Sequence, residues 1–82
     1  MDKMLFQITL GAVIRERRTR LGYSQETFAE SAGMHRNYVG AIERGQQNVS
    51  LHNLLAIAEA LNMPISMLFT LAEAEIITPR KA

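Results

Sequence analysis

The chain has 82 residues, enough for one small domain and too few for two independent hydrophobic cores. Hydrophobic residues make up 48% and charged residues 21%, which excludes a disordered chain and fits an ordinary globular domain. There is no Cys, so disulfide scaffolds, thiol nucleophiles and cysteine-based metal sites are excluded, and a formal net charge of +1 gives no global argument for nucleic-acid binding.

The N-terminal segment shows no targeting signal. Met1–Phe6 contains neither a long apolar region nor a cleavage-site pattern, and the longest apolar runs of the chain are only a few residues. A membrane-spanning helix needs about 20 consecutive apolar residues. We therefore expect a cytoplasmic protein that does not span a membrane.

Apolar residues recur at helical spacing, and turn residues divide them into short segments. The first predicted helix runs from Ile8 to Leu21 and ends at Gly22, with cations in its last turn that suit the helix dipole. Ser24 is a good N-cap for a second helix from Gln25 to Ala32, which ends at Gly33. These two segments already indicate a helical domain.

Two further helices are bounded by the same kinds of turn and capping residues. A third helix is predicted from His35 to Arg44, with Gly45 as its end. After a polar loop, Ser50 caps a fourth helix, in which apolar residues repeat at helical spacing from Leu51 to Leu61. No strand or hairpin signal appears between any of these segments.

A fifth helix is predicted after the break at Asn62-Met63-Pro64, because Pro64 is compatible with a first helical turn. Two Ile residues and a Pro disfavour helix in Ile76–Ala82, so a frayed tail is expected there. The sequence thus predicts a single all-α domain over residues 1–82, a compact five-helix bundle with its core at about residues 8–72. The apolar residues of the fifth helix are Ile65, Leu68, Phe69, Leu71 and Ala72.

The second and third helices form the most informative unit. Each has about two turns, which is marginal for an isolated helix, and only a tight turn at Gly33-Met34 separates them. Such helices persist when they pack at a steep angle against others, which is the helix-turn-helix geometry. In that geometry the second helix of the pair can enter the major groove of DNA.

The polar residues of this unit suit contacts with DNA. The start of the third helix presents His35, Arg36 and Asn37, of which Arg can bind guanine through two hydrogen bonds and Asn can pair with adenine. Gly40 and Ala41, one turn later, are small enough for a close approach to base edges. We assign contacts with the phosphate backbone to Ser24, Gln25, Tyr38, Arg44, Gln46, Gln47 and Asn48.

Charge is distributed in the same direction. Residues 1–49 hold seven Lys and Arg against five Asp and Glu, whereas residues 50–82 hold two against three. The stretch Arg15–Arg20 is interpreted as a solvated helix face, within which Arg18 is a candidate for a structural pair with Glu26 or Glu43. His35 and His52 have no ligand set or paired base nearby, so they are interpreted as surface or capping residues, and no metal or cofactor is expected.

A family pattern extends over most of the chain. Its residues are Leu10, Gly11, Ile14, Arg15, Arg18, Gly22, Ser24, Gln25, Phe28, Ala29, Ala32, Gly33, Tyr38, Val39, Ile42, Glu43, Arg44, Gly45, Leu54, Ile57, Ala58, Ala60 and Leu61. Over about residues 8–70 this pattern resembles the Cro/C1-type (XRE) helix-turn-helix family. Within that family, His35–Arg44 followed by a polar loop and Ser50-Leu51 is similar to the controller proteins of restriction-modification systems.

The resemblance implies roles for individual residues. Arg36 and Asn37 match base-reading positions, whereas Gln25, Arg44 and residues 46–48 match backbone-contact positions. Glu43 matches a residue that, in activating members, faces RNA polymerase or orients the neighbouring Arg. The family also implies a homodimer formed through the C-terminal helices, and the residues assigned to that interface are Ile65, Leu68, Phe69 and Leu71.

We therefore expect a regulator without enzymatic activity that binds a partly palindromic double-stranded DNA operator as a homodimer. It would control its own or an adjacent restriction-modification promoter, with RNA polymerase as a candidate further partner. Ala41 departs from the larger polar residue of many relatives, which argues against a base contact from that turn. The alternatives are an antitoxin or phage-type repressor of the same fold, and a protein-interaction module that has lost DNA binding. That module would carry a neutral or acidic recognition helix, unlike Arg36, Asn37 and Arg44 here.

Overall fold

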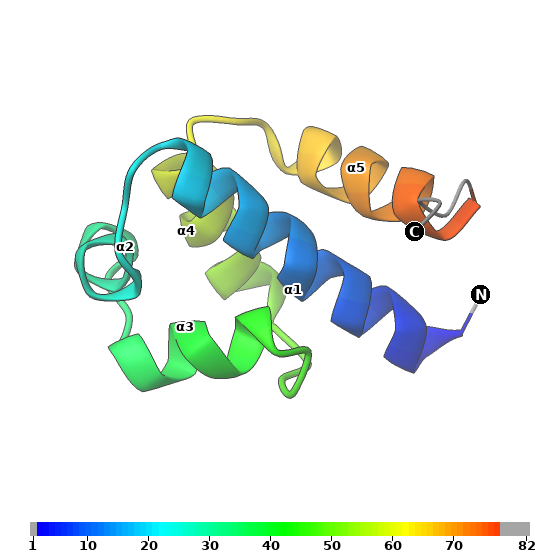
Figure 1. The fold of residues 1–82 in the computed structure, drawn as a ribbon, viewed down its shortest axis with the longest axis horizontal. Coiled ribbons are helices and arrows are strands. Elements are labelled where there is room, and N and C mark those ends of the chain that lie inside the picture. The colour runs from blue at the N-terminus through cyan, green and yellow to red at the C-terminus, as the bar shows by residue number, and fades with distance from the viewer. Residues whose placement is uncertain (1, 78–82) are drawn as a thin grey trace.

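The computed structural model describes residues 2–77, and within this range the chain forms helices and no strand. Figure 1 shows α1 running through the middle of the molecule, with α5 along one side of it and α3 along the other. This arrangement confirms the predicted all-α bundle of five helices. The helices are α1 (Lys3–Arg20), α2 (Gln25–Ala32), α3 (Arg36–Glu43), α4 (Leu51–Ala60) and α5 (Ile65–Ile77).

Helix α1 begins five residues earlier than the sequence predicted. Asp2 is its N-cap, and the Asp2 Oδ1 atom accepts hydrogen bonds from the backbone N–H groups of Met4 at 2.9 Å and Leu5 at 3.1 Å. These bonds satisfy donors that the first turn of a helix otherwise leaves without partners. The added turns bring Phe6 against Phe69 of α5, with ring centroids 6.0 Å apart.

Helices α1 to α4 all end in the same way. At each end one residue adopts a left-handed conformation, and the next residue donates its backbone N–H to the carbonyl five positions earlier. This closure turns the chain sharply, so the connections stay short. It confirms the three glycine ends that the sequence predicted and adds an asparagine. The residues with positive φ are Gly22 (82°), Gly33 (69°), Gly45 (75°) and Asn62 (56°).

The core receives side chains from all five helices. The largest fully buried side chains are Phe28, Ile14, Ile57, Leu68 and Val39. Burial of such side chains contributes about 1.5–3 kcal/mol each to the hydrophobic stabilisation, before entropy is subtracted. The core therefore holds α2 and α3 in place although each has only eight residues.

Not every apolar residue of the helical pattern faces this core. Ile8 and Ala12 of α1 are exposed, as are Leu51 and Leu55 of α4. Helix α5 continues through Ile77, so the predicted fraying is wrong for Ile76 and Ile77, because α5 packs along α1 over most of its length. Residues 78–82 of the predicted tail lie outside the described residues.

No single described helix is both long and apolar enough to cross a membrane, although α4 and α5 together meet that test by length and composition, with a 97° bend between them.

Candidate nucleic-acid interface

The N-terminal turn of α3 presents the three predicted base-reading residues together at the surface. His35 is the N-cap residue and makes no capping hydrogen bond through its side chain. Arg36 and Asn37 follow it as the first two residues of the helix, and all three are exposed. Within residues 2–77, the side chains of Arg36 and Asn37 form no hydrogen bond or ion pair. Their donors and acceptors therefore remain available for an external ligand.

A buried ion pair fixes the other end of α3 to α1. The Arg18 Nε atom lies 2.7 Å from Glu43 Oε2, and Arg18 Nη2 donates to Glu43 Oε1 at 3.1 Å. The third nitrogen of Arg18, Nη1, donates to the carbonyl of Tyr23 at 2.7 Å. This confirms the candidate pair of Arg18 with Glu43. It excludes Glu26 as the partner, because Nε and Nη2 of Arg18 both bind the Glu43 carboxylate and Nη1 binds the carbonyl of Tyr23.

The predicted polymerase contact through Glu43 is wrong. The Glu43 side chain is only 2% exposed, since its carboxylate lies between Arg18 and the amide of Gln25. A side chain so enclosed cannot reach another protein. Its carboxylate instead pairs with Arg18 of α1, whereas the neighbouring Arg44 donates to Gln46.

Gln25, at the start of α2, extends this network toward the surface. Its Nε2 atom donates to Glu43 Oε1 at 3.0 Å, so the amide is held in one orientation and the α2 N-terminus is tied to the α3 C-terminus. Ser24 is the predicted N-cap, and its hydroxyl accepts from the backbone N–H of Thr27 at 3.0 Å. Both residues lie at a helix N-terminus, where backbone N–H groups favour an anion.

Tyr38 has a structural contact that the sequence did not predict. It is half-buried, and its hydroxyl oxygen accepts a hydrogen bond from Asn53 Nδ2 at 3.1 Å, which links α3 to α4. The hydroxyl hydrogen of Tyr38 is still able to donate to a phosphate. The predicted backbone contact of Tyr38 therefore remains a prediction.

The loop after α3 is held from α1. Gln7 Nε2 donates to the carbonyl of Gly45 at 2.7 Å, and Gly45 has no room for a side chain because a Cβ there would lie 2.8 Å from the Cα atom of Ile8. Arg44 is exposed, and its Nε atom donates to Gln46 Oε1 at 3.1 Å. Gln47 and Asn48 are also exposed, so the loop offers the polar surface that the sequence predicted.

Gly40 does not lie at the exposed surface where the sequence placed it. It is buried rather than open to base edges, because its α-carbon faces the side chains of Gln25 and Arg44. Ala41 is half-buried. The predicted close approach of DNA at Gly40 is therefore wrong, because the spacing of α2 and α3 places that face against α2.

One predicted dimer residue is also misplaced. Leu68 has 0% exposure and belongs to the core, so its assignment to an interface is wrong. Ile65, Phe69 and Leu71 are half-buried and pack against the core while keeping part of their surface accessible. Their predicted contact with a second copy remains a prediction.

Two residues that support α3 were missed by sequence reasoning about the site. A Cβ on Gly11 would overlap the carbonyl oxygen of Ile42, so α1 and the last turn of α3 meet backbone to backbone. Gln7 holds the loop carbonyl from a distance of 38 residues in sequence. No local signal could reveal the contact of Gln7, whereas the small residue inside a long helical pattern at Gly11 is the usual sign of a close helix crossing.

Similarities to known proteins bear on this interface. The model of the helix-turn-helix family matches residues 14–68. The control protein C.SmaI of Serratia marcescens is 42% identical over 57 residues, which cover 70% of this chain and 68% of that protein. Helices α2 and α3 both lie within the segment that the family model matches.

Solved structures agree with the sequence comparison. The restriction-modification controller protein C.AhdI from Aeromonas hydrophila is 48% identical, with a TM-score of 0.74 over 76% of this chain and 94% of that chain. The wild-type restriction-modification controller protein C.Esp1396I is 26% identical, with a TM-score of 0.79 over 94% of this chain and 97% of that chain. The likeness to the second structure extends over nearly all of both chains.

Proposed function

Because the chain belongs to the helix-turn-helix (XRE) family of non-enzymatic DNA-binding regulators and is related to restriction-modification controller proteins, we propose that it binds a specific operator and controls a promoter. The operator is a partly palindromic duplex, and the promoter is its own or that of an adjacent restriction-modification system. Occupancy of the operator blocks or recruits RNA polymerase according to the position of the site. This role agrees with the cytoplasmic location expected from the sequence.

The observation that carries the proposal is the pair Arg36 and Asn37 at the exposed start of α3. Each has a side chain suited to one purine in the major groove, and neither is used by the fold within residues 2–77. Arg44 and the exposed loop of residues 46–48 would contact phosphate oxygens and fix the register of α3. Specificity then depends on Arg36 and Asn37, and affinity on the residues around them.

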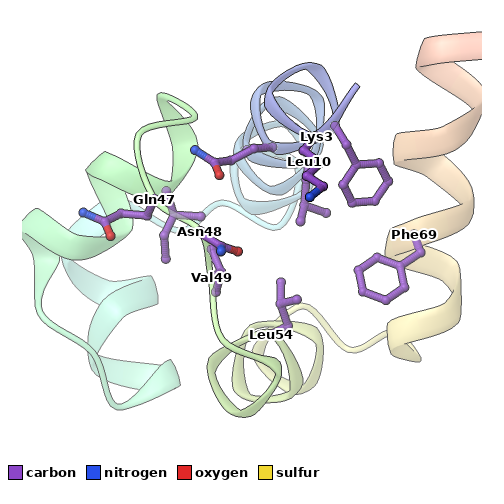
Figure 2. Close-up of a pocket in the computed structure, with 11 residues that line it drawn as sticks. Lys3, Leu10, Gln47, Asn48, Val49, Leu54 and Phe69 are labelled. Atoms are coloured by element: carbon purple, nitrogen blue, oxygen red, sulfur yellow. The ribbon is translucent and has the colours of Figure 1, made fainter. Parts of the chain in front are cut away.

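A homodimer is part of the proposal because one short recognition helix contacts only a few base pairs. Two-fold symmetry places two such helices about 34 Å apart, which is one turn of DNA. An apolar pocket of about 430 Å³ lies between α1, α4, α5 and the loop after α3, and Leu54 and Phe69 point into it from two helices (Figure 2). Leu51, one turn before Leu54 on α4, is 64% exposed.

We place the dimer interface on this side of the molecule. Exposed Leu51 and the accessible part of Phe69 provide apolar surface that the chain's own packing leaves open. Because a two-fold interface uses the same patch on both copies, this apolar surface of one copy would face the same surface of the other. Burial of such surface in a second copy would also stabilise a domain of only 82 residues.

The proposed function is tested by selecting bound sequences from a random duplex pool with the native chain. We expect enrichment of one short motif in two inverted copies with a fixed spacing of about 10 base pairs between their centres. A single motif without an inverted copy would contradict the dimer. A pool without any enriched motif would contradict sequence-specific binding.

A further inference from the structure

Gly40 occupies a place where the fold does not require glycine. It lies inside α3 and is not among the glycines with positive φ. Glycine in a helix interior destabilises the helix relative to alanine, because the unfolded chain loses more backbone freedom. Because α3 has only eight residues, we expect the space left by the absent side chain to serve a purpose that offsets this penalty.

At the other buried glycines, the fold itself leaves no room for a side chain. At Gly11 a Cβ would overlap backbone carbonyl oxygens of α3, and at Gly45 it would meet the backbone of Ile8 while φ is +75°. Neither backbone can move without shifting a helix. At Gly40, in contrast, the three atoms nearest to a Cβ all belong to the ends of two side chains.

Those two side chains are Arg44 and Gln25. The position of a Cβ on Gly40 lies 3.0 Å from Arg44 Nη1, 3.6 Å from Gln25 Oε1 and 3.8 Å from Gln25 Nε2. Arg44 comes from the end of α3 and Gln25 from the start of α2, so the two helices of the motif converge on this point. A methyl group here would push the flexible Arg44 guanidinium away and leave both helices where they are.

Both side chains are tethered at one end and retain free donors. Arg44 Nε donates to Gln46, and within residues 2–77 its two terminal nitrogens have no hydrogen-bond partner. Gln25 Nε2 gives one hydrogen to Glu43, which leaves its second hydrogen. A guanidinium and an amide that both lie next to the same point suit the oxygens of one phosphate group.

We propose that Gly40 is a positioning residue for a phosphate contact shared by α2 and α3. The missing side chain provides the space in which the Arg44 guanidinium lies beside the Gln25 amide, so that one phosphate of the DNA backbone binds both. This inference rests on the proposed DNA binding. It adds that Gly40, which touches no DNA, controls the affinity for any duplex through Arg44.

The test is Gly40→Ala, measured by urea unfolding and by binding to a labelled random-sequence duplex over a series of NaCl concentrations. The urea midpoint should be unchanged or higher, because Ala favours the helix and only a flexible side chain must move. The affinity should fall about tenfold, as for the loss of one hydrogen bond to a charged group. The slope of log affinity against log salt should become shallower by about 0.9, the value for one phosphate contact.

Arg44→Ala and the double variant show whether the effect passes through Arg44. Arg44→Ala should lower the affinity and the salt slope in the same way, and Gly40→Ala should cause no further loss in that background. Full additivity of the two losses, or native affinity and salt slope for Gly40→Ala, would overturn the proposal. A lower urea midpoint for Gly40→Ala would also overturn it, since Gly40 would then serve the fold. If the native chain binds no duplex under these conditions, the proposed function fails together with this inference.

Discussion

Arg18→Ala tests the buried network that holds the recognition helix to the rest of the domain. Arg18 is 7% exposed and donates from all three guanidinium nitrogens, to the two carboxylate oxygens of Glu43 and to the carbonyl of Tyr23. Truncation would leave the Glu43 carboxylate buried with only the Gln25 amide as a donor. A buried charge that loses its counter-charge strongly destabilises the folded state.

The magnitude follows from the burial of both partners. Breaking a buried ion pair by removing one side costs about 3–5 kcal/mol. A domain of 82 residues has a total unfolding free energy of about 4–12 kcal/mol, from about 0.05–0.15 kcal/mol per residue. Arg18→Ala should therefore remove a large part of the stability, and the variant should be partly unfolded at room temperature if the native value is near the lower end.

The assay is urea unfolding followed by circular dichroism, with Arg20→Ala as the matched control on the same helix. Arg20 pairs with Glu16 at 3.4 Å, but its side chain is 65% exposed. Exposed pairs of this spacing contribute about 0.3–0.5 kcal/mol. Similar losses for Arg18→Ala and Arg20→Ala would refute the reasoning, because burial would then have no effect on the strength of the pair.

Two further predictions concern the helix crossing and the dimer. Gly11→Ala should lower the unfolding free energy by about 1–3 kcal/mol, because a Cβ would overlap the carbonyl of Ile42 and separate α1 from α3; an unchanged urea midpoint would contradict that crossing. Leu51→Asp should shift the molar mass measured by sedimentation from twice 9.2 kDa toward 9.2 kDa, since it places a charge in the proposed interface. Leu5→Asp, also in the first turn of its helix and 45% exposed, should leave the dimer intact, and equal dissociation by both variants would argue against the interface.

Helix ends marked by a serine cap or a glycine were predictable, because capping is a local property, whereas the start of α1 and the end of α5 were not. Ser24 and Ser50 accept hydrogen bonds from the backbone N–H groups three residues on, as their sequence positions indicated. Gly22 and Gly33 have the positive φ that ends a helix in a left-handed residue. The start of α3 also lies where the sequence predicted, although His35 makes no capping hydrogen bond through its side chain.

Most contacts between distant segments were beyond local patterns, although Glu43 was one of two candidate partners predicted for Arg18. Leu68 and Phe69 are adjacent apolar residues of one helix, yet only Leu68 is fully buried, because α5 packs with the Leu68 side facing the core. Glu43 had two possible roles by resemblance, and only the packing of α1 against α3 decides that it faces Arg18. Gly40 was predicted to face DNA, whereas the crossing of α2 over α3 turns it toward Gln25.

The central claim is that α3 reads base sequence through Arg36, and one comparison tests it most directly. The affinity of the native chain and of Arg36→Ala is measured on the selected operator and on a random-sequence duplex at the same salt concentration. We predict a loss of about 1–3 kcal/mol on the operator, little loss on the random duplex beyond its electrostatic part, and relaxed preference at one base position. Equal losses on both duplexes would contradict the account, because Arg36 would then contact the backbone and carry no sequence information.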